Sequence, residues 1–213
     1  MADEPTIFNP HDATLWDQRF SHPEPAYGDQ PSLFLVEHAH LFKPDQRVFV
    51  PADGEGRNGL WLARRGLDVT CVDLSAIGLN KIQSTADREQ LRVQTLRKDL
   101  FTWDWPKARY DHIVAVYFHM TPEHRKRIHR AMCDALVPGG YIFLEAFHKD
   151  QFGLKSGGPR DPSMLFDQEM LRDDFGQMKI EVLQRVEIRL KEGRLHQGPA
   201  VLMRMLARAD VTK

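Results

Sequence analysis

Two features of the sequence suit ligand binding by their residue types and spacing: the glycine-rich segment 54–59 (GEGRNG) and the carboxylate of Asp73. Because glycine has no Cβ, Gly54 and Gly56 would let the backbone approach a ligand closely. A carboxylate that ends the next strand is placed to accept hydrogen bonds from both hydroxyls of a ribose. The pattern therefore predicts a pocket for a nucleoside-type ligand.

The residues around these groups predict a βαβ unit. Residues 48–50 form a short apolar run typical of a buried strand, and residues 60–63 have helical spacing. Gly66 ends that helix, and residues 69–73 form a second strand. The glycine turn and the terminal acid then meet at the mouth of the unit. Dinucleotide-binding and S-adenosylmethionine-binding folds both begin in this way, so the unit alone leaves the ligand open.

The remaining chain predicts an α/β fold built around this unit. Further strands are expected at 91–96, 110–117 and 141–146, followed by an antiparallel pair at 179–190 and 200–207 that residues 191–199 connect. Helices are expected at 13–20, 32–42, 76–86, 122–136 and 168–175. Residues 1–12 are expected to be a flexible tail and residues 13–213 a single domain. Residues 151–164 are expected to be a long loop, which in a small domain indicates a functional role.

Composition limits the classes of function. The formal net charge is −1, from 29 basic and 30 acidic residues, so no global field attracts nucleic acid or anionic lipid. The two cysteines, Cys71 and Cys133, form no framework of disulfides and no metal-binding pair. The acidic N-terminus lacks the apolar core of a signal peptide, and no apolar run reaches membrane-spanning length. We expect a cytoplasmic protein, monomeric or a small homo-oligomer, without nucleic-acid, membrane or metal partners.

The N-terminal segment favours one of the two cofactor classes. Nearly fifty residues precede the first strand, whereas nicotinamide dehydrogenases usually begin close to it. Trp16 and Phe20 lie four residues apart, on one face of the first expected helix. They are expected either to form the core of a cover over the sheet or to close as a lid on the ligand.

Taken together, these motifs resemble class I S-adenosylmethionine-dependent methyltransferases over roughly residues 13–208. The resemblance rests on GEGRN after the first strand, Asp73 ending the second, Asp99 after the third, and PGG before the fifth. The sequence is most similar to the tellurite-resistance and thiopurine S-methyltransferase branch, through WDQRF near the N-terminus, SGGPRDP in the long loop and EGRLH before the last strand. Val50 and Ala52 depart from the common motif, which has an acid and a glycine there.

The resemblance implies a fold, a cofactor and a set of site residues. The fold is a Rossmann-like, doubly wound, seven-stranded, mostly parallel sheet with an antiparallel C-terminal hairpin and N-terminal covering helices. The cofactor is S-adenosyl-L-methionine, which leaves as S-adenosyl-L-homocysteine. The residues expected to contact it are Trp16, Arg19, Asp53, Gly54, Gly56, Asp73, Leu74, Asp99, Leu100 and Tyr117.

Methyl transfer from a sulfonium requires alignment of the nucleophile, the methyl group and the sulfur, and exclusion of water. A soft anionic acceptor needs little base catalysis, whereas a harder acceptor requires a base, typically histidine. Histidines expected near the carboxyl ends of strands are His119, His148 and His196. Arg160 and Arg194 are candidate anion holders, and the resemblance favours Arg194 and His196. The predicted catalytic set is His196, Arg194, Arg160 and His119.

Four classes of protein function could use a glycine turn of this kind, and the sequence favours them to different degrees. The leading one is methyl transfer to a small sulfur, selenium or tellurium nucleophile, such as a thiol, a thiopurine or tellurite. An NAD(P)-dependent oxidoreductase would use the same glycine turn, and a non-catalytic cofactor-binding protein would explain the irregular Val50 and Ala52. A nucleic-acid methyltransferase is disfavoured, since no basic domain and no Asn-Pro-Pro-Tyr or Asp-Pro-Pro-Tyr motif is present.

Overall fold

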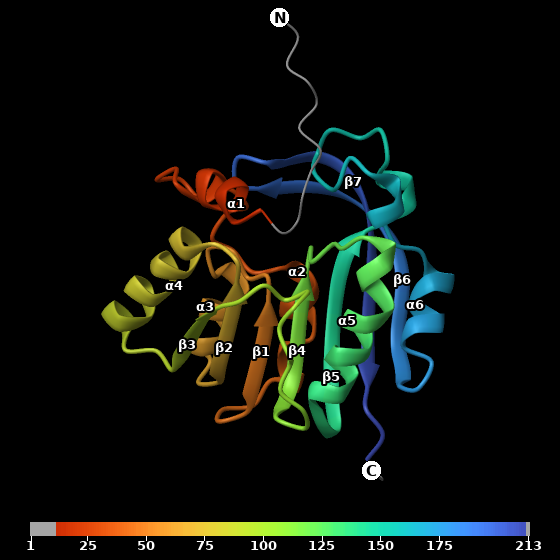
Figure 1. The fold of residues 1–213 in the computed structure, drawn as a ribbon, viewed down its shortest axis with the longest axis horizontal. Coiled ribbons are helices and arrows are strands. Elements are labelled where there is room, and N and C mark those ends of the chain that lie inside the picture. The colour runs from red at the N-terminus through yellow and green to blue at the C-terminus, as the bar shows by residue number, and fades with distance from the viewer. Residues whose placement is uncertain (1–11, 212–213) are drawn as a thin grey trace, which may run out of the picture.

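A seven-stranded sheet runs through the centre of the computed structural model, which describes residues 12–211 (Figure 1). The strands are β1 (Arg47–Pro51), β2 (Asp68–Asp73), β3 (Val93–Arg97), β4 (Tyr110–Val116), β5 (Leu136–Phe147), β6 (Lys179–Glu192) and β7 (His196–Arg208). Their order is β3-β2-β1-β4-β5-β7-β6. The first five are parallel, and β7 is antiparallel to both β5 and β6. The predicted fold class is thereby confirmed.

Helices cover both faces of the sheet. The α-helices are α1 (Ala13–Phe20), α2 (Leu33–Glu37), α3 (Arg57–Arg64), α4 (Ala76–Glu89), α5 (Pro122–Ala135) and α6 (Gln168–Asp174). Short 3-10 turns are η1 (Ala39–Leu41), η2 (Lys149–Gln151) and η3 (Pro162–Met164). Apolar side chains of α2, α3 and α4 pack on one face, and those of α5 and α6 pack on the other. Nearly continuous apolar strands such as β4 are thus buried on both sides.

Helix α1 and the far end of the β6–β7 hairpin lie together above the carboxyl ends of the parallel strands, toward the top of Figure 1. The α1 segment begins at Asp12, whose carboxylate accepts hydrogen bonds from the backbone of Thr14 and Leu15. The rest of the predicted tail lies outside the described residues. In doubly wound sheets, ligands bind at this edge of the sheet.

Most element boundaries shift by a few residues from the sequence prediction, and three differences change an element or a connection. The helix expected over 32–42 is split into α2 and η1, because His38 leaves the helical conformation and its ring bonds to the Phe34 carbonyl. The turn expected at residues 138–140 lies within β5, which pairs with β4 at Leu136 and again from Tyr141, across a register shift. The long connection expected at 191–199 is shorter, because β6 and β7 stay paired up to Glu192 and His196.

Candidate active site

The carboxyl ends of β1, β2 and β4 open into a cavity of 780 Å³. Helix α1 contributes to its lining on one side, and residues of the long loop after β5 contribute on another. The cavity brings together most of the residues that the sequence predicted to form the site, namely Trp16, Arg19, Asp53, Gly54, Asp73, Leu74, Asp99, Leu100, Tyr117, His119, Arg160 and His196. Gly56 and Arg194 do not line it.

The two glycines of the turn have different roles. Both adopt left-handed conformations, with φ of 58° at Gly54 and 88° at Gly56. Gly54 lines the cavity, and a Cβ there would lie 2.9 Å from the Phe20 ring. Gly56 instead faces α4, where a Cβ would lie 2.6 Å from Cγ1 of Ile82. The absence of a side chain at Gly56 therefore allows α3 and α4 to pack closely, rather than allowing a ligand to approach.

Ala52 makes the backbone turn for which the common motif uses glycine. It has a φ of 53°, in the left-handed region that glycine adopts freely and other residues reach at a cost of about 1 kcal/mol. Ala52 directly follows β1 and lines the cavity. The unusual residue therefore preserves the path of the turn, so its presence gives no reason to doubt ligand binding.

Asp73 is held rigidly at the end of β2. One carboxylate oxygen accepts the Gly54 N–H and the other accepts the Ser75 N–H, both at 2.8 Å. Burial raises the pKa of Asp73, against these backbone hydrogen bonds, which lower it. Each carboxylate oxygen keeps a further lone pair for a ligand hydroxyl.

Asp99 is both a turn residue and part of the cavity lining. Its carboxylate accepts a hydrogen bond of 2.9 Å from the backbone N–H of Phe101, which makes it a turn residue. It also lines the cavity, beside Leu100 and Phe101. The turn thus fixes an acid next to two apolar side chains, an arrangement that suits a purine ring and its exocyclic amine.

Asp53 is a buried acid in the cavity wall. Its carboxylate accepts the Gly59 N–H at 3.2 Å, and a Cβ at Gly59 would lie 2.3 Å from it. Burial and the charge of Asp73 together raise the pKa of Asp53 to about 7, against a hydrogen bond from the Cys71 thiol, which lowers it. A bound ammonium group would stabilise the ionised form of this acid.

This acid makes stability depend on pH. Because the pKa of Asp53 is about 7 in the folded protein and lower when unfolded, the folded state binds the extra proton between about pH 4 and 7. Stability due to this group is therefore lost as pH rises through that window, by on the order of 4 kcal/mol. We expect Asp53→Asn to flatten the dependence of the free energy of unfolding on pH, as measured by urea unfolding from pH 4 to 8. An unchanged slope would contradict the assignment.

Helix α1 covers one side of the cavity through aromatic side chains. Trp16 stacks on Phe20 with ring centroids 5.8 Å apart, and the Arg19 guanidinium lies 4.8 Å from the centre of the Trp16 ring. Phe20 is 2% exposed and reaches Gly54, where a Cβ would lie 2.9 Å from its ring. Arg19 also donates a 2.8 Å hydrogen bond to the Tyr27 hydroxyl. Phe20 is therefore both a core residue and part of the cavity lining.

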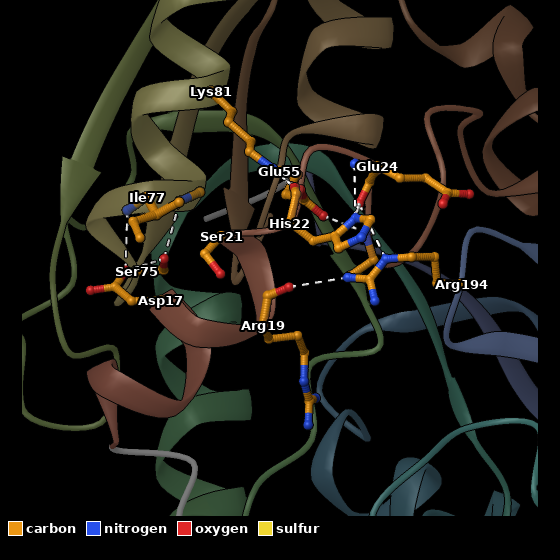
Figure 2. A network of polar contacts seen from close by, with 12 residues as sticks. Asp17, Arg19, Ser21, His22, Glu24, Glu55, Ser75, Ile77, Lys81 and Arg194 are labelled. Carbon is orange, nitrogen blue, oxygen red and sulfur yellow. Dashed lines mark hydrogen bonds and ion pairs between the residues drawn. The ribbon is translucent and has the colours of Figure 1, made fainter.

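Polar contacts fasten α1 and the following loop, as Figure 2 shows. The Asp17 carboxylate accepts hydrogen bonds from the Ser75 hydroxyl and the Ile77 N–H at the start of α4. Lys81 donates to the His22 carbonyl and to Glu55, each at 2.7 Å. These contacts hold α1 and the loop after it to the segments that contain the glycine turn and Asp73.

Arg194 belongs to this fastening and not to the cavity. Its guanidinium donates to the carbonyls of Glu24 and Arg19, at 3.3 and 3.4 Å (Figure 2). Its donors are directed to the backbone of α1 and of the loop after it, so Arg194 lies apart from the cavity residues, and the catalytic, anion-holding role expected for it stays a prediction.

Replacing Arg194 with alanine is expected to loosen α1. Loss of hydrogen bonds of this kind weakens local structure by about 1 kcal/mol, so amide exchange in residues 13–21 should quicken about fivefold. Hydrogen-exchange mass spectrometry measures this. Lys191→Ala, at an exposed position of the same hairpin, is the control. Equal exchange in both variants would exclude the fastening role.

His119 is held by the backbone at both ring nitrogens. Nδ1 donates to the Met164 carbonyl at 2.9 Å, and Nε2 accepts the Phe147 N–H at 3.1 Å. Burial lowers the pKa of His119 to about 4, against the hydrogen bond to Met164. These backbone groups occupy both ring nitrogens and hold the ring in place, and the base role expected for His119 stays a prediction. His148 does not line the cavity, and its ring caps η2.

His196 lies in the cavity wall within a group of aromatic rings. Its ring centroid is 4.4 Å from that of Tyr27, 4.7 Å from Tyr117 and 5.4 Å from Phe147. Its Nδ1 lies 3.2 Å from a carboxylate oxygen of Glu192. Sequence reasoning missed Glu192, because the predicted connection placed it in a loop. No local signal in the sequence indicates this pairing, because hairpin register depends on the partner strand.

Arg160 lies in the loop after β5, which buried polar contacts hold in place. The Gln151 amide donates to the Ser156 hydroxyl and the Gly157 carbonyl, both at 3.0 Å, and accepts the Val201 N–H at 2.9 Å. Arg160 is exposed and lines the cavity. It is placed where a guanidinium can meet an anionic group entering the cavity.

Comparison with known proteins agrees with this geometry. Residues 51–140, which contain the glycine turn, Asp73 and Asp99, match the model of a family described as a methyltransferase domain. No curated protein matches the sequence significantly. The family match makes S-adenosylmethionine the cofactor expected in this cavity, and it supports S-adenosylmethionine-dependent methyl transfer.

Solved structures share the fold. TehB from Haemophilus influenzae is 22% identical with a TM-score of 0.69, over 83% of this chain and 61% of its own. This chain thus spans less than two thirds of TehB. A protein described in the conversion of a disulfide bond into a thioacetal group during echinomycin biosynthesis is 18% identical with a TM-score of 0.70, over 94% and 93% of the two chains. A methyltransferase from Methanosarcina mazei is 16% identical with a TM-score of 0.67, over 83% and 97%.

The part of the chain that the structure describes contains neither a metal-binding cluster nor a helix that could span a membrane. Within residues 12–211, no group of three or more His, Cys, Asp or Glu side chains is arranged to hold a metal ion. In the same residues, every helix falls short of the length and apolar character needed to span a membrane.

Proposed function

We propose that the protein transfers the methyl group of S-adenosylmethionine to a small sulfur, selenium or tellurium nucleophile, as a member of the tellurite-resistance and thiopurine S-methyltransferase branch. The observation that supports the proposal is the cavity itself, whose lining includes Asp73 and Asp99 together with His196 and Arg160. The 780 Å³ volume suits a cofactor together with a small acceptor.

In this proposal the cofactor lies along the ends of β1, β2 and β3. Asp73 accepts the ribose hydroxyls, Asp99 and Leu100 bind the adenine, and Leu74 and Gly54 line its path. Asp53 and Arg19 bind the amino acid end, where the acid faces the ammonium and the guanidinium faces the carboxylate. Trp16 covers the cofactor from α1, and Tyr117 lies between the cofactor and the acceptor. Bound S-adenosylmethionine would supply an electrophilic methyl group on a sulfonium.

The chain's own residues would then align the acceptor and exclude water. Arg160 approaches from the loop after β5 and His196 from the hairpin, and both line the cavity. The branch assignment is supported by the sequence motifs and by the likeness of the fold to TehB. The similarity of fold to the protein described in thioacetal formation during echinomycin biosynthesis is consistent with an acceptor that contains sulfur.

The alternatives have less support. A nicotinamide oxidoreductase would not explain the match of residues 51–140 to a methyltransferase domain. A non-catalytic protein would explain the unusual residues Val50 and Ala52, but Val50 is a buried residue of β1 and the left-handed conformation of Ala52 keeps the usual turn.

An acceptor screen tests the proposal. The purified protein is incubated with S-adenosylmethionine and thiols, thiopurines, selenite or tellurite, and products are identified by mass spectrometry. Methylation of at least one of these acceptors is expected. Methylation of amines or alcohols alone would overturn the acceptor class, and absence of any product despite tight cofactor binding would favour the non-catalytic alternative.

A further inference from the structure

Three charged or titratable groups meet at one carboxylate oxygen beside the cavity. Glu192 and His196 are the last pair of the β6–β7 hairpin, directly opposite each other in register. Oε2 of Glu192 lies 3.2 Å from Nδ1 of His196 and 3.2 Å from Nη1 of Arg57. Arg57 comes from the first turn of α3 and is 8% exposed. The glycine turn and the hairpin are thus joined through Glu192.

This arrangement decides which nitrogen of His196 carries the proton. A carboxylate can only accept, so the neutral imidazole bonds to it through Nδ1–H and leaves Nε2 as an acceptor. Among residues 12–211, Nε2 has no hydrogen-bond partner and is not sealed from the cavity. A Cβ at Gly157 would lie 2.5 Å from Cδ2 and 2.8 Å from Nε2, so only a glycine fits against this edge of the ring.

The charges around the ring favour a neutral imidazole next to an ionised carboxylate. Burial lowers the pKa of His196, and Arg57 and Arg19 lower it further, against Glu192, which raises it. Burial raises the pKa of Glu192, but its contacts with His196 and Arg57 outweigh this and lower it. The titratable and charged groups facing His196 are Glu192, Arg57, Arg19, His119, Tyr27 and Tyr117.

We propose that Glu192 and Arg57 are positioning residues that hold His196 as a general base for an acceptor that arrives with its proton, such as a thiol. The inference rests on the proposed function. The S–H proton passes to Nε2, and the sulfur attacks the methyl carbon. The bond from that carbon to the sulfonium breaks with its electron pair remaining on the cofactor sulfur. The products are a thioether, neutral S-adenosylhomocysteine and the imidazolium, which Glu192 stabilises.

Arg57 fixes the base relative to the cofactor turn. It directly follows Gly56 and donates to the carbonyls of Tyr27 and Gln30, at 3.3 and 3.5 Å. The same guanidinium therefore contacts the backbone of the loop after α1 and the Glu192 carboxylate that orients His196. These contacts fix His196 relative to the glycine turn, and alignment of the methyl transfer would depend on that placement.

The first test compares Glu192→Gln with Glu187→Gln, at an exposed position of the same strand, using thiols of graded acidity. Glutamine can donate to Nδ1 and so favour the wrong tautomer. For thiols still protonated at the assay pH, Glu192→Gln is expected to lower kcat about 100-fold, while thiols already ionised lose less than about threefold. The acid limb of its pH profile should shift to lower pH, and S-adenosylhomocysteine affinity should remain within about twofold. Equal loss for all thiols, or no loss, overturns the inference.

A second test needs no turnover. Nitrogen-15 NMR of the His196 ring in the full chain should show the proton on Nδ1 and a bare Nε2, and Glu192→Gln should change this. A proton on Nε2 in the wild type overturns the inference. If the wild type binds cofactor but methylates no acceptor, the proposed function fails, whereas the NMR result still decides whether Glu192 sets the tautomer.

Discussion

Replacing Asp73 with alanine is expected to weaken binding of S-adenosylhomocysteine at least about 100-fold. Two ribose hydroxyls would each lose a hydrogen bond to a charged acceptor, worth about 1.5–3 kcal/mol apiece. The preorganisation of the site adds to the effect, because Gly54 and Ser75 already hold the carboxylate in place. Isothermal titration calorimetry measures the change in Kd.

Two further variants make this result interpretable. Asp68→Ala, at an exposed position of the same strand, should leave the affinity unchanged. Asp73→Asn keeps an acceptor oxygen for one of the two backbone N–H groups but turns an amide donor toward the other. It should show an intermediate loss of affinity, and circular dichroism checks that it is folded. Wild-type affinity in a folded Asp73 variant would remove this carboxylate from the cofactor site.

Replacing His196 with asparagine is expected to lower kcat about 100-fold for acceptors that must lose a proton, within the range usual for a general base. Cofactor affinity should change little, because the ring lies on the acceptor side of the proposed arrangement. Steady-state kinetics with S-adenosylmethionine, combined with calorimetry, separate these two effects.

His40→Asn is a suitable control, because His40 is exposed in η1 and does not line the cavity. An unchanged turnover number in His196→Asn would return His196 to a structural role. A parallel fall in cofactor affinity would instead place the ring beside the cofactor.

The sequence was sufficient for the sheet and for the glycine turn and acids that line the cavity, because these depend on local signals. Buried parallel strands have apolar runs, and the glycine turn and Asp73 lie next to such strands in the chain. Asp73, Gly54 and Asp99 line one cavity because the ends of parallel strands meet at one edge of a sheet.

The acceptor side could be predicted less well because it depends on long-range contacts. Arg194 has a motif that resembles the family's, yet its guanidinium binds backbone carbonyls of the cover. His119 follows a strand, yet two backbone groups from later segments occupy its ring. Glu192 was missed because hairpin register depends on the partner strand, which local residue types do not determine.

Titration of the purified protein with S-adenosylhomocysteine, S-adenosylmethionine and NADH by calorimetry tests the central claim most directly. The account predicts micromolar or tighter binding of the first two and no binding of NADH. Binding of NADH alone would contradict it, and would mean that the glycine turn and Asp73 serve a nicotinamide dinucleotide.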